Sequence, residues 1–557
     1  MSPLTFGGRF GWLHDPATLH DWGHRTTGVV IVSAIGRDAR CAHRPLRLFA
    51  DQLAREGYPT LRYDHLGAGD SLEVPAGTET LAEWLAGVRA AVALLKEQTC
   101  VTGVVLAGLR LGAGLAAMAS EGADGLILLA PVVSGRTWLR ELRLSGAMNG
   151  TPTDGAATDR SGFEADGVEF SSATAASLSA LDLRQIRHAP AEVLLVGRDT
   201  GAGTLAARLA DLGARVEDAP FEGYAELFED AHSNLAPTAL FDLATAWMQD
   251  RFAQLADGQA PDIAAEPATL TLDGATERAV LFGEGLRGVV CSPSGKSTQQ
   301  GVIFLNSGGD PRAGIGRFAV QAARCLAWEG IASLRFDLAG LGDSDDPSKG
   351  VPRHIYDTPR GADVAAAIDL MQAQGCSDIT LTGICAGAHH GVNAAIADSR
   401  VARVLGISLV KMVWRPGDSL AIGKRDEGRS TRTYMEALGN RSTWLRLLRG
   451  EVHVVSVART LASRFAERMA VRREESTGQF QKDIARLAAR GAKVRLLMGT
   501  DDASLDELET YFGPQGERLT ALPGMIVEIV PGLDHGLARA ASRTVALASL
   551  RDLLDLK

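Results

Sequence analysis

The two halves of this chain repeat one another, and the repeat constrains the fold more than any other feature of the sequence. Residues 61–71 (LRYDHLGAGDS) return as residues 334–344 (LRFDLAGLGDS), an offset of 273. Residues 108–112 face residues 383–387 at an offset of 275, and His232 faces His535 at an offset of 303. Such a repeat indicates two copies of one domain. The jump in offset predicts a longer insertion in the second copy, and we expect domains at 1–257 and 258–557.

Short apolar runs alternate with helical patterns inside each copy. In the second copy, we expect strands at 302–305, 332–336, 379–382, 404–409, 494–498 and 526–530. Amphipathic helices are expected at 318–328, 362–372 and 388–397. This alternation predicts an α/β fold with two mostly parallel sheets flanked by helices. Ligands bind beyond the carboxyl ends of the strands in such sheets.

Composition excludes several classes of protein. The 557 residues have a net charge of −10, which argues against a nucleic-acid partner. No stretch approaches about 18 uninterrupted apolar residues, so no membrane span is expected. The N-terminus lacks the pattern of a secretory signal, and the six cysteines show no paired CxxC spacing. We therefore expect a cytoplasmic protein with no metal site and no cofactor.

Cys385 stands where a nucleophile would be expected. It is the centre of the Gly-x-Cys-x-Gly segment at residues 383–387, between an expected strand and an expected helix. Small residues on both sides permit a sharp turn, and the side chain then lies at a helix N-terminus that favours an anion. A thiol placed there is pushed toward the thiolate. The alternative is that Cys385 only fills space in the core.

An acid and a histidine follow Cys385 in chain order. Asp501 follows one expected strand and His535 follows the next. The order nucleophile, acid, histidine is that of the α/β-hydrolases. Both copies resemble α/β-hydrolase domains, and the chain is most similar to the hydrolases found beside exosortase and exopolysaccharide gene clusters. This resemblance rests on the repeated segment at 334–344 and on the Arg-rich segment that follows the strand expected at 404–409, the sixth strand of the family's domain.

The resemblance implies a role for each residue of the site. Cys385 would attack a carbonyl, His535 would act as base and then as acid, and Asp501 would orient His535. The backbone N–H of Ala386 would be one oxyanion donor, and Ser307 would belong to the loop that supplies the other. The substrate-binding candidates are Asn306, Trp414, Arg415 and Trp444.

Several neighbouring residues have less specific interpretations. Asp502 is interpreted as a solvated neighbour of Asp501. His389 and His390 are interpreted as packing or capping residues in the helix after Cys385, with a role in substrate binding as the alternative.

The first copy has Arg110 at the position equivalent to Cys385, although it retains Asp199 and His232. A guanidinium cannot attack a carbonyl, because it has no deprotonated form in proteins. Three readings remain open: a structural copy that braces or dimerises with the second, an anion site at Arg110, or an activity through a residue outside this alignment.

The insertion in the second copy is strongly basic. Residues 411–473 contain two lysines and twelve arginines against two aspartates and four glutamates. The α/β-hydrolases place their lid here, so we expect a helical, Arg-rich lid over about 411–485. Such a lid suggests an anionic acyl substrate, linked to coenzyme A or to a carrier protein. The alternative is that these arginines form ion pairs with the acidic body or only solvate the lid.

Three functional hypotheses follow. The first is an acyl-transfer enzyme with a Cys-His-Asp triad, acting as a thioesterase or esterase with water and as an acyltransferase with an amine or a hydroxyl. The second is a lactone or dienelactone-type hydrolase of a small acid. The third is a non-catalytic scaffold in a biosynthetic assembly. Partners are expected to be a small acyl substrate and, as an open alternative, a second copy of the chain in a homodimer.

Overall fold

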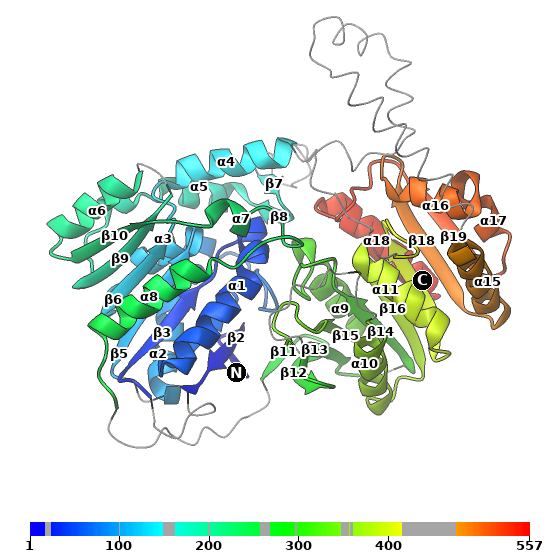
Figure 1. The fold of residues 1–557 in the computed structure, drawn as a ribbon, viewed down its shortest axis with the longest axis horizontal. Helices are drawn as coiled ribbons and strands as arrows, with labels where there is room; N and C mark the ends of the chain where they lie inside the picture. The colour runs from blue at the N-terminus through cyan, green and yellow to red at the C-terminus, as the bar shows by residue number, and fades with distance from the viewer. Residues whose placement is uncertain are drawn as a thin grey trace, which may run out of the picture.

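The computed structural model describes residues 1–16, 24–99, 101–148, 162–198, 201–256, 268–295, 298–346, 356, 360–414 and 475–556. These residues form two large β-sheets, one from each half of the chain, which lie side by side with helices on both faces (Figure 1). The predicted α/β fold class is confirmed, because both sheets are mostly parallel and flanked by helices. The predicted boundary at residue 257 lies outside the described residues.

The first sheet has eight strands in the order β1-β2-β4-β3-β5-β6-β9-β10. Their bounds are β1 (Ser2–Phe6), β2 (Arg9–His14), β3 (Thr27–Val32), β4 (Thr60–Tyr63), β5 (Gly103–Leu109), β6 (Gly125–Leu129), β9 (Glu192–Gly197) and β10 (Arg215–Pro220). β1 and β2 are antiparallel to their neighbours, and the strands from β4 to β10 are parallel. A short hairpin of β7 (Phe163–Ala165) and β8 (Val168–Phe170) stands apart from this sheet.

The second sheet repeats this order with one additional edge strand, β11-β12-β13-β15-β14-β16-β17-β18-β19. Its strands are β11 (Thr269–Leu272), β12 (Ala275–Phe282), β13 (Leu286–Pro293), β14 (Gln300–Leu305), β15 (Ala332–Asp337), β16 (Asp378–Ile384), β17 (Val401–Ile407), β18 (Lys493–Gly499) and β19 (Met525–Val530). The six strands expected from the sequence correspond to β14–β19. β11–β13 are antiparallel and are not part of the expected pattern.

Helices cover both faces of each sheet. In the first copy, α1 (Gly36–Arg55) and α8 (Thr238–Arg251) cover one face, and α2 (Thr80–Thr99), α3 (Leu111–Met118) and α6 (Gly201–Asp211) cover the other. In the second copy, α9 (Phe318–Trp328) and α18 (Ala540–Leu553) cover one face, and α10 (Gly361–Ala373), α11 (Ala386–Ala397), α15 (Glu475–Ala489) and α16 (Ser504–Phe512) cover the other. Among the described residues, the remaining α-helices are α4 (Gly135–Met148), α5 (Ser172–Ala180), α7 (Tyr224–Leu227) and α17 (Glu517–Thr520).

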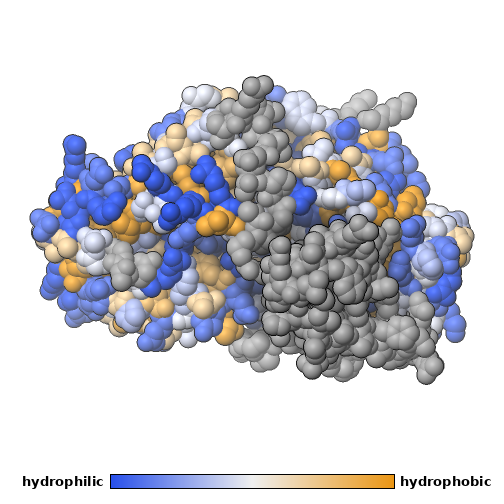
Figure 2. Space-filling model, turned by 90° about the horizontal axis from the view of Figure 1, so that it is seen from above, coloured by the Kyte–Doolittle hydropathy of each residue, from blue (hydrophilic) through white to orange (hydrophobic). Residues whose placement is uncertain are grey.

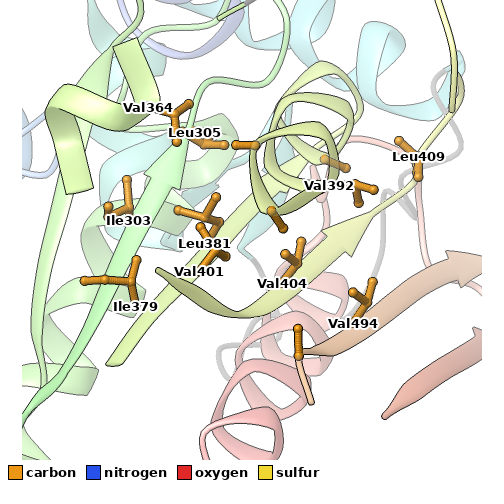
Figure 3. Packing of buried hydrophobic residues seen from close by; sticks show 14 of the residues in the cluster. Ile303, Leu305, Val364, Ile379, Leu381, Val392, Val401, Val404, Leu409 and Val494 are labelled. Carbon is orange, nitrogen blue, oxygen red and sulfur yellow. The ribbon is translucent and has the colours of Figure 1, made fainter. Parts of the chain in front are cut away.

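The core beneath α11 fixes the strands that carry the candidate nucleophile. Leu305 of β14, Leu381 of β16 and Val404 of β17 belong to one buried cluster with Val364 of α10 and Val392 of α11 (Figure 3). Apolar side chains on neighbouring parallel strands thus pack against the same helices, and burying each contributes roughly 1.5–3 kcal/mol. This packing sets the position of the turn between β16 and α11.

Reciprocal ion pairs join the two copies. Arg62 Nη2 donates to Asp343 Oδ1 at 2.8 Å, and Arg335 Nε donates to Asp70 Oδ1 at 2.7 Å. Arg62 and Arg335 are equivalent in the repeat, and so are Asp70 and Asp343, with an offset of 273 residues in both cases. The arginine of each copy therefore pairs with the aspartate of the other copy, which is the pattern of a two-fold dimer interface. The chain therefore contains an internal pseudo-dimer.

Arg312 connects these pairs across the interface. Its guanidinium lies 2.7 Å from Asp70, 2.7 Å from Asp337 and 2.8 Å from Asp343, and its side chain is 2% exposed. Burial by itself raises the pKa of Asp70, but the charges of Arg312 and Arg335 lower that pKa to about 2. Breaking a buried pair by removing one partner costs about 3–5 kcal/mol, so this network fixes how the copies dock.

The surface of the described residues is mixed in character. Seen from above, hydrophilic and hydrophobic residues are interspersed over the first copy (Figure 2). Among the described helices, none combines the length and the apolar character needed to cross a membrane.

Candidate functional site

Cys385 lies between β16 and α11 in a strained backbone conformation, with φ 54° and ψ −108°. Two glycines make this turn possible. A Cβ at Gly383 would lie 2.5 Å from the backbone of Gly387, and a Cβ at Gly387 would lie 2.8 Å from the carbonyl oxygens of Leu305 and Asn306. Strain of this kind persists only where the surroundings enforce it, and it is common at active sites. It places Sγ at the N-terminus of α11, where negative charge is stabilised.

His535 and Asp502 come from the carboxyl ends of neighbouring parallel strands. His535 lies in the loop after β19, and Asp502 lies in the turn after β18. His535 Nδ1 is 3.0 Å from Asp502 Oδ2, and the Asp502 side chain is 2% exposed. The backbone N–H of Ser504 donates to Asp502 Oδ1 at 2.8 Å. The carboxylate is thus held by its own turn and directed at the imidazole.

Asp502 and His535 shift each other's pKa values. Burial by itself lowers the pKa of His535, but the charge of Asp502 and its hydrogen bond, followed by the Cys385 sulfur, raise that pKa well above its ordinary value. Burial by itself raises the pKa of Asp502, but the charge of His535 and its hydrogen bond lower that pKa to about 2. The Cys385 sulfur is thus among the groups that raise the pKa of His535. Because Nδ1 faces Asp502, Nε2 is the nitrogen that serves the sulfur.

The structure brings Asp502, and not Asp501, to His535. We expected Asp501 to orient the imidazole and Asp502 to be its solvated neighbour, but Asp501 is exposed and Asp502 is buried. The turn after Gly499 decides between them. The Asp502 N–H donates to the carbonyl of Gly499 at 3.2 Å, which folds the chain back and directs the Asp502 side chain inward.

Tyr356 also belongs to this site, although no sequence pattern predicts it. Its hydroxyl lies 3.3 Å from Cys385 Sγ, and its ring stacks on Trp414 with centroids 4.9 Å apart. The ring also meets the edge of His389, 5.1 Å away, and the His389 Nδ1–H donates to the carbonyl of Lys411 at 2.7 Å. The sulfur therefore lies beside an aromatic wall. No periodic pattern surrounds Tyr356 in the sequence, so spacing could not have found it.

The predicted oxyanion residues border the elbow. Ala386 is the first residue of α11, where a backbone N–H has no acceptor inside the helix, and it is fully buried. Ser307 follows β14 and is also buried. The prediction that Asn306 binds substrate is wrong, because its side-chain amide is already engaged within the protein. It donates to Asp310 O and Asp337 Oδ1 and accepts from the Leu338 N–H.

Of the three other substrate-binding candidates, only Trp414 lies among the described residues. Trp414 lies against Tyr356 at the site. Arg415 and Trp444 lie outside the described residues, as does most of the predicted lid at 411–485.

The first copy keeps the elbow but has an arginine in place of the cysteine. Arg110 has φ 55° and ψ −120°, nearly the conformation of Cys385. Its guanidinium pairs with Asp38 at 3.2 Å and with Glu141 at 3.0 Å. The anions that Arg110 binds are thus carboxylates of its own copy. Asp199 lies outside the described residues.

A cavity of about 350 Å³ lies between the two copies rather than at Cys385. Its walls include Tyr63 and His65 of the first copy and Pro311 and Arg317 of the second, while neither Cys385 nor Arg110 lines it.

Comparison with known proteins gives a likeness of fold. No protein-family profile matches the chain, and no curated protein matches it. Est1E from Butyrivibrio proteoclasticus with bound ferulic acid is 16% identical over 46% of this chain and 100% of its own, with a TM-score of 0.36. A cold-adapted esterase from an Arctic intertidal metagenomic library is 17% identical over 52% of this chain and 97% of its own, with a TM-score of 0.31.

An α/β serine hydrolase homologue from Coxiella burnetii is 13% identical over 53% of this chain and 97% of its own, with a TM-score of 0.28. The chain is thus distantly similar in structure, over about half of its length, to α/β-hydrolases that include esterases.

Proposed function

We propose that the second copy is an acyl-transfer enzyme that acts on an activated acyl ester or thioester through Cys385. The observation that carries the proposal is the pair of His535 and Asp502, 3.0 Å apart, together with Cys385 at a strained elbow that opens a helix, the sulfur being one of the groups that raise the pKa of His535. A raised imidazole pKa beside a thiol is the condition under which proton transfer gives a thiolate and an imidazolium.

The reaction follows from this arrangement. His535 Nε2 takes the proton of Cys385 Sγ, and the thiolate attacks the acyl carbonyl carbon. Backbone N–H groups at Ala386 and in the loop of Ser307 stabilise the oxyanion. The tetrahedral intermediate collapses, its C–O or C–S bond breaks, and the leaving alcohol or thiol receives the proton from His535. Water, an amine or a hydroxyl then attacks the Cys385 thioester, with His535 again acting as base.

The side chains beside Cys385 favour a flat acyl group. Tyr356 and Trp414 stack beside the sulfur, and an acyl chain with an aromatic or unsaturated group would pack against them. The ferulic acid bound to Est1E is an aromatic acid, which fits this substrate class. The basic composition of residues 411–473 favours an anionic carrier of that acyl group, such as coenzyme A.

The experiment is intact-mass analysis after brief exposure of the protein to 4-nitrophenyl cinnamate. We expect one cinnamoyl adduct on the wild type and none on Cys385→Ala. Cys325→Ala is the matched control, because Cys325 is a half-buried thiol on α9 whose pKa is raised by burial, and it should keep the adduct. An adduct that survives Cys385→Ala, or none on a folded wild type, refutes the proposal and favours a non-catalytic role.

A further inference from the structure

The loop after β14 is held in place by the first copy. We define the oxyanion loop as residues 306–312. Its start packs on the elbow, since the carbonyl oxygen of Asn306 would lie 2.8 Å from a Cβ at Gly387. Three of its later residues, Gly309, Asp310 and Arg312, contact side chains of the first copy.

His232 makes the contact nearest to Ser307. The Gly309 N–H donates to His232 Nδ1 at 2.9 Å. A Cβ at Gly308 would lie 2.1 Å from the His232 ring, and a Cβ at Gly309 would lie 1.9 Å from the carbonyl oxygen of Ala231. Only glycines fit this close approach. Because Nδ1 accepts, the ring proton is on Nε2, which lies 3.6 Å from Asp230 Oδ1.

Two ion pairs extend this attachment. Arg40 Nη1 of α1 donates to Asp310 Oδ1 at 2.8 Å, and the Asp310 side chain is 2% exposed. Arg312 Nη2 lies 2.7 Å from Asp70. The loop is therefore bound by the first copy at three successive places, while Asn306 ties its beginning to Asp337 within the second copy.

The two equivalent histidines thus have different tasks. His535 pairs with Asp502 and interacts with Cys385 of its own copy, whereas His232 accepts the Gly309 N–H of the neighbouring copy. We infer that His232 is a positioning residue, supported by Arg40, which holds the oxyanion loop of the second copy so that its backbone N–H groups meet the developing oxyanion. This inference rests on the proposed function, and it gives the first copy a role in turnover.

The expected size follows from the geometry that oxyanion donors require. Losing one donor outright costs about 10²–10³ in kcat, and a displacement of about 1 Å can cost about 10²-fold. His232 does not donate to the substrate itself, so its loss loosens the loop without removing a donor. We expect a decrease in kcat of about tenfold with KM changed less than threefold.

The test compares two replacements of one exposed side chain. His232→Leu keeps bulk but removes the acceptor for the Gly309 N–H. His232→Asn places an oxygen close to the position of Nδ1 and should restore most of kcat. His188→Leu, an exposed histidine of the first copy outside the interface, is the matched control and should behave as wild type. Alkylation of Cys385 by iodoacetamide forms no oxyanion, so its rate should stay within twofold in all three variants.

Hydrogen exchange of the peptide covering the oxyanion loop separates this inference from the proposed function. His232→Leu should speed exchange there. If exchange is faster in His232→Leu but the wild type forms no acyl adduct, the attachment of the loop is supported and the proposed function is refuted. The inference is overturned if exchange and kcat are both unchanged in His232→Leu, if His232→Asn is as impaired as His232→Leu, or if alkylation falls in parallel with kcat.

Discussion

Replacing Asp502 by asparagine removes the negative charge that lies 3.0 Å from His535 Nδ1. Burial by itself raises the pKa of Asp502, but the charge and hydrogen bond of His535 bring it from its ordinary 3.8 to about 2, and this net shift corresponds to about 2–3 kcal/mol, or a factor of roughly thirty to one hundred in an equilibrium. The neutral amide also lets the imidazole take the tautomer that cannot accept the proton of Cys385. We therefore expect the rate of Cys385 acylation at pH 7 to fall at least thirtyfold.

Stopped-flow release of 4-nitrophenol during the first turnover measures this rate. Asp501→Asn is the matched control, since Asp501 is the exposed neighbour one residue earlier, and its rate should stay within twofold of wild type. Thermal unfolding should show that both variants are folded. The reasoning is refuted if Asp501→Asn loses the activity while Asp502→Asn keeps it.

Four further predictions follow from the same contacts. The alkaline limb of kcat/KM should move to lower pH in Asp502→Asn, because the carboxylate that raises the pKa of His535 is gone; a pH–rate profile in which this limb does not move contradicts the assignment. Asp70 has a folded pKa of about 2 and an unfolded pKa near 3.8, so its stabilisation is complete above pH 4 and lost as the pH falls toward 2; urea unfolding between pH 5 and pH 2.5 should show this loss, and the loss should be smaller in Asp70→Asn. Gly387→Ala places a methyl group 2.8 Å from two carbonyl oxygens and should lower both the melting temperature and acylation; a wild-type melting curve would contradict the close approach. The double variant Arg110→Cys, Cys385→Ala should form no acyl adduct by intact mass, since His232, the histidine equivalent to His535, is engaged at Gly309; an adduct on residue 110 would overturn this.

The sequence predicted the parts of the site that depend on local pattern. The repeat and the alternation of strands and helices predicted both sheets, and the small residues around Cys385 predicted the elbow. His535 could be chosen because it follows the last strand of a parallel sheet, where loops meet the carboxyl ends of their neighbours. The antiparallel strands β11, β12 and β13 were missed, because they precede the repeated segments in the chain.

What the sequence could not predict depends on turns and on distant contacts. Asp501 and Asp502 follow the same strand, and only the backbone turn at Gly499 decides which carboxylate faces inward. Tyr356 reaches Cys385 from a segment without periodicity. The contact of His232 with Gly309 requires the docking of two copies, which no spacing along the chain encodes.

Cys385 acylation in wild type and in His535→Ala, followed by mass spectrometry of the peptide that contains residue 385, is the most direct measurement of the central claim. If the imidazole of His535 activates the sulfur, one acyl group should add rapidly at residue 385 of the wild type. Addition should be at least a hundredfold slower in His535→Ala, because general-base assistance supplies about that order of magnitude. Equal rates in the two proteins, or an acyl group found only on other residues, would contradict it.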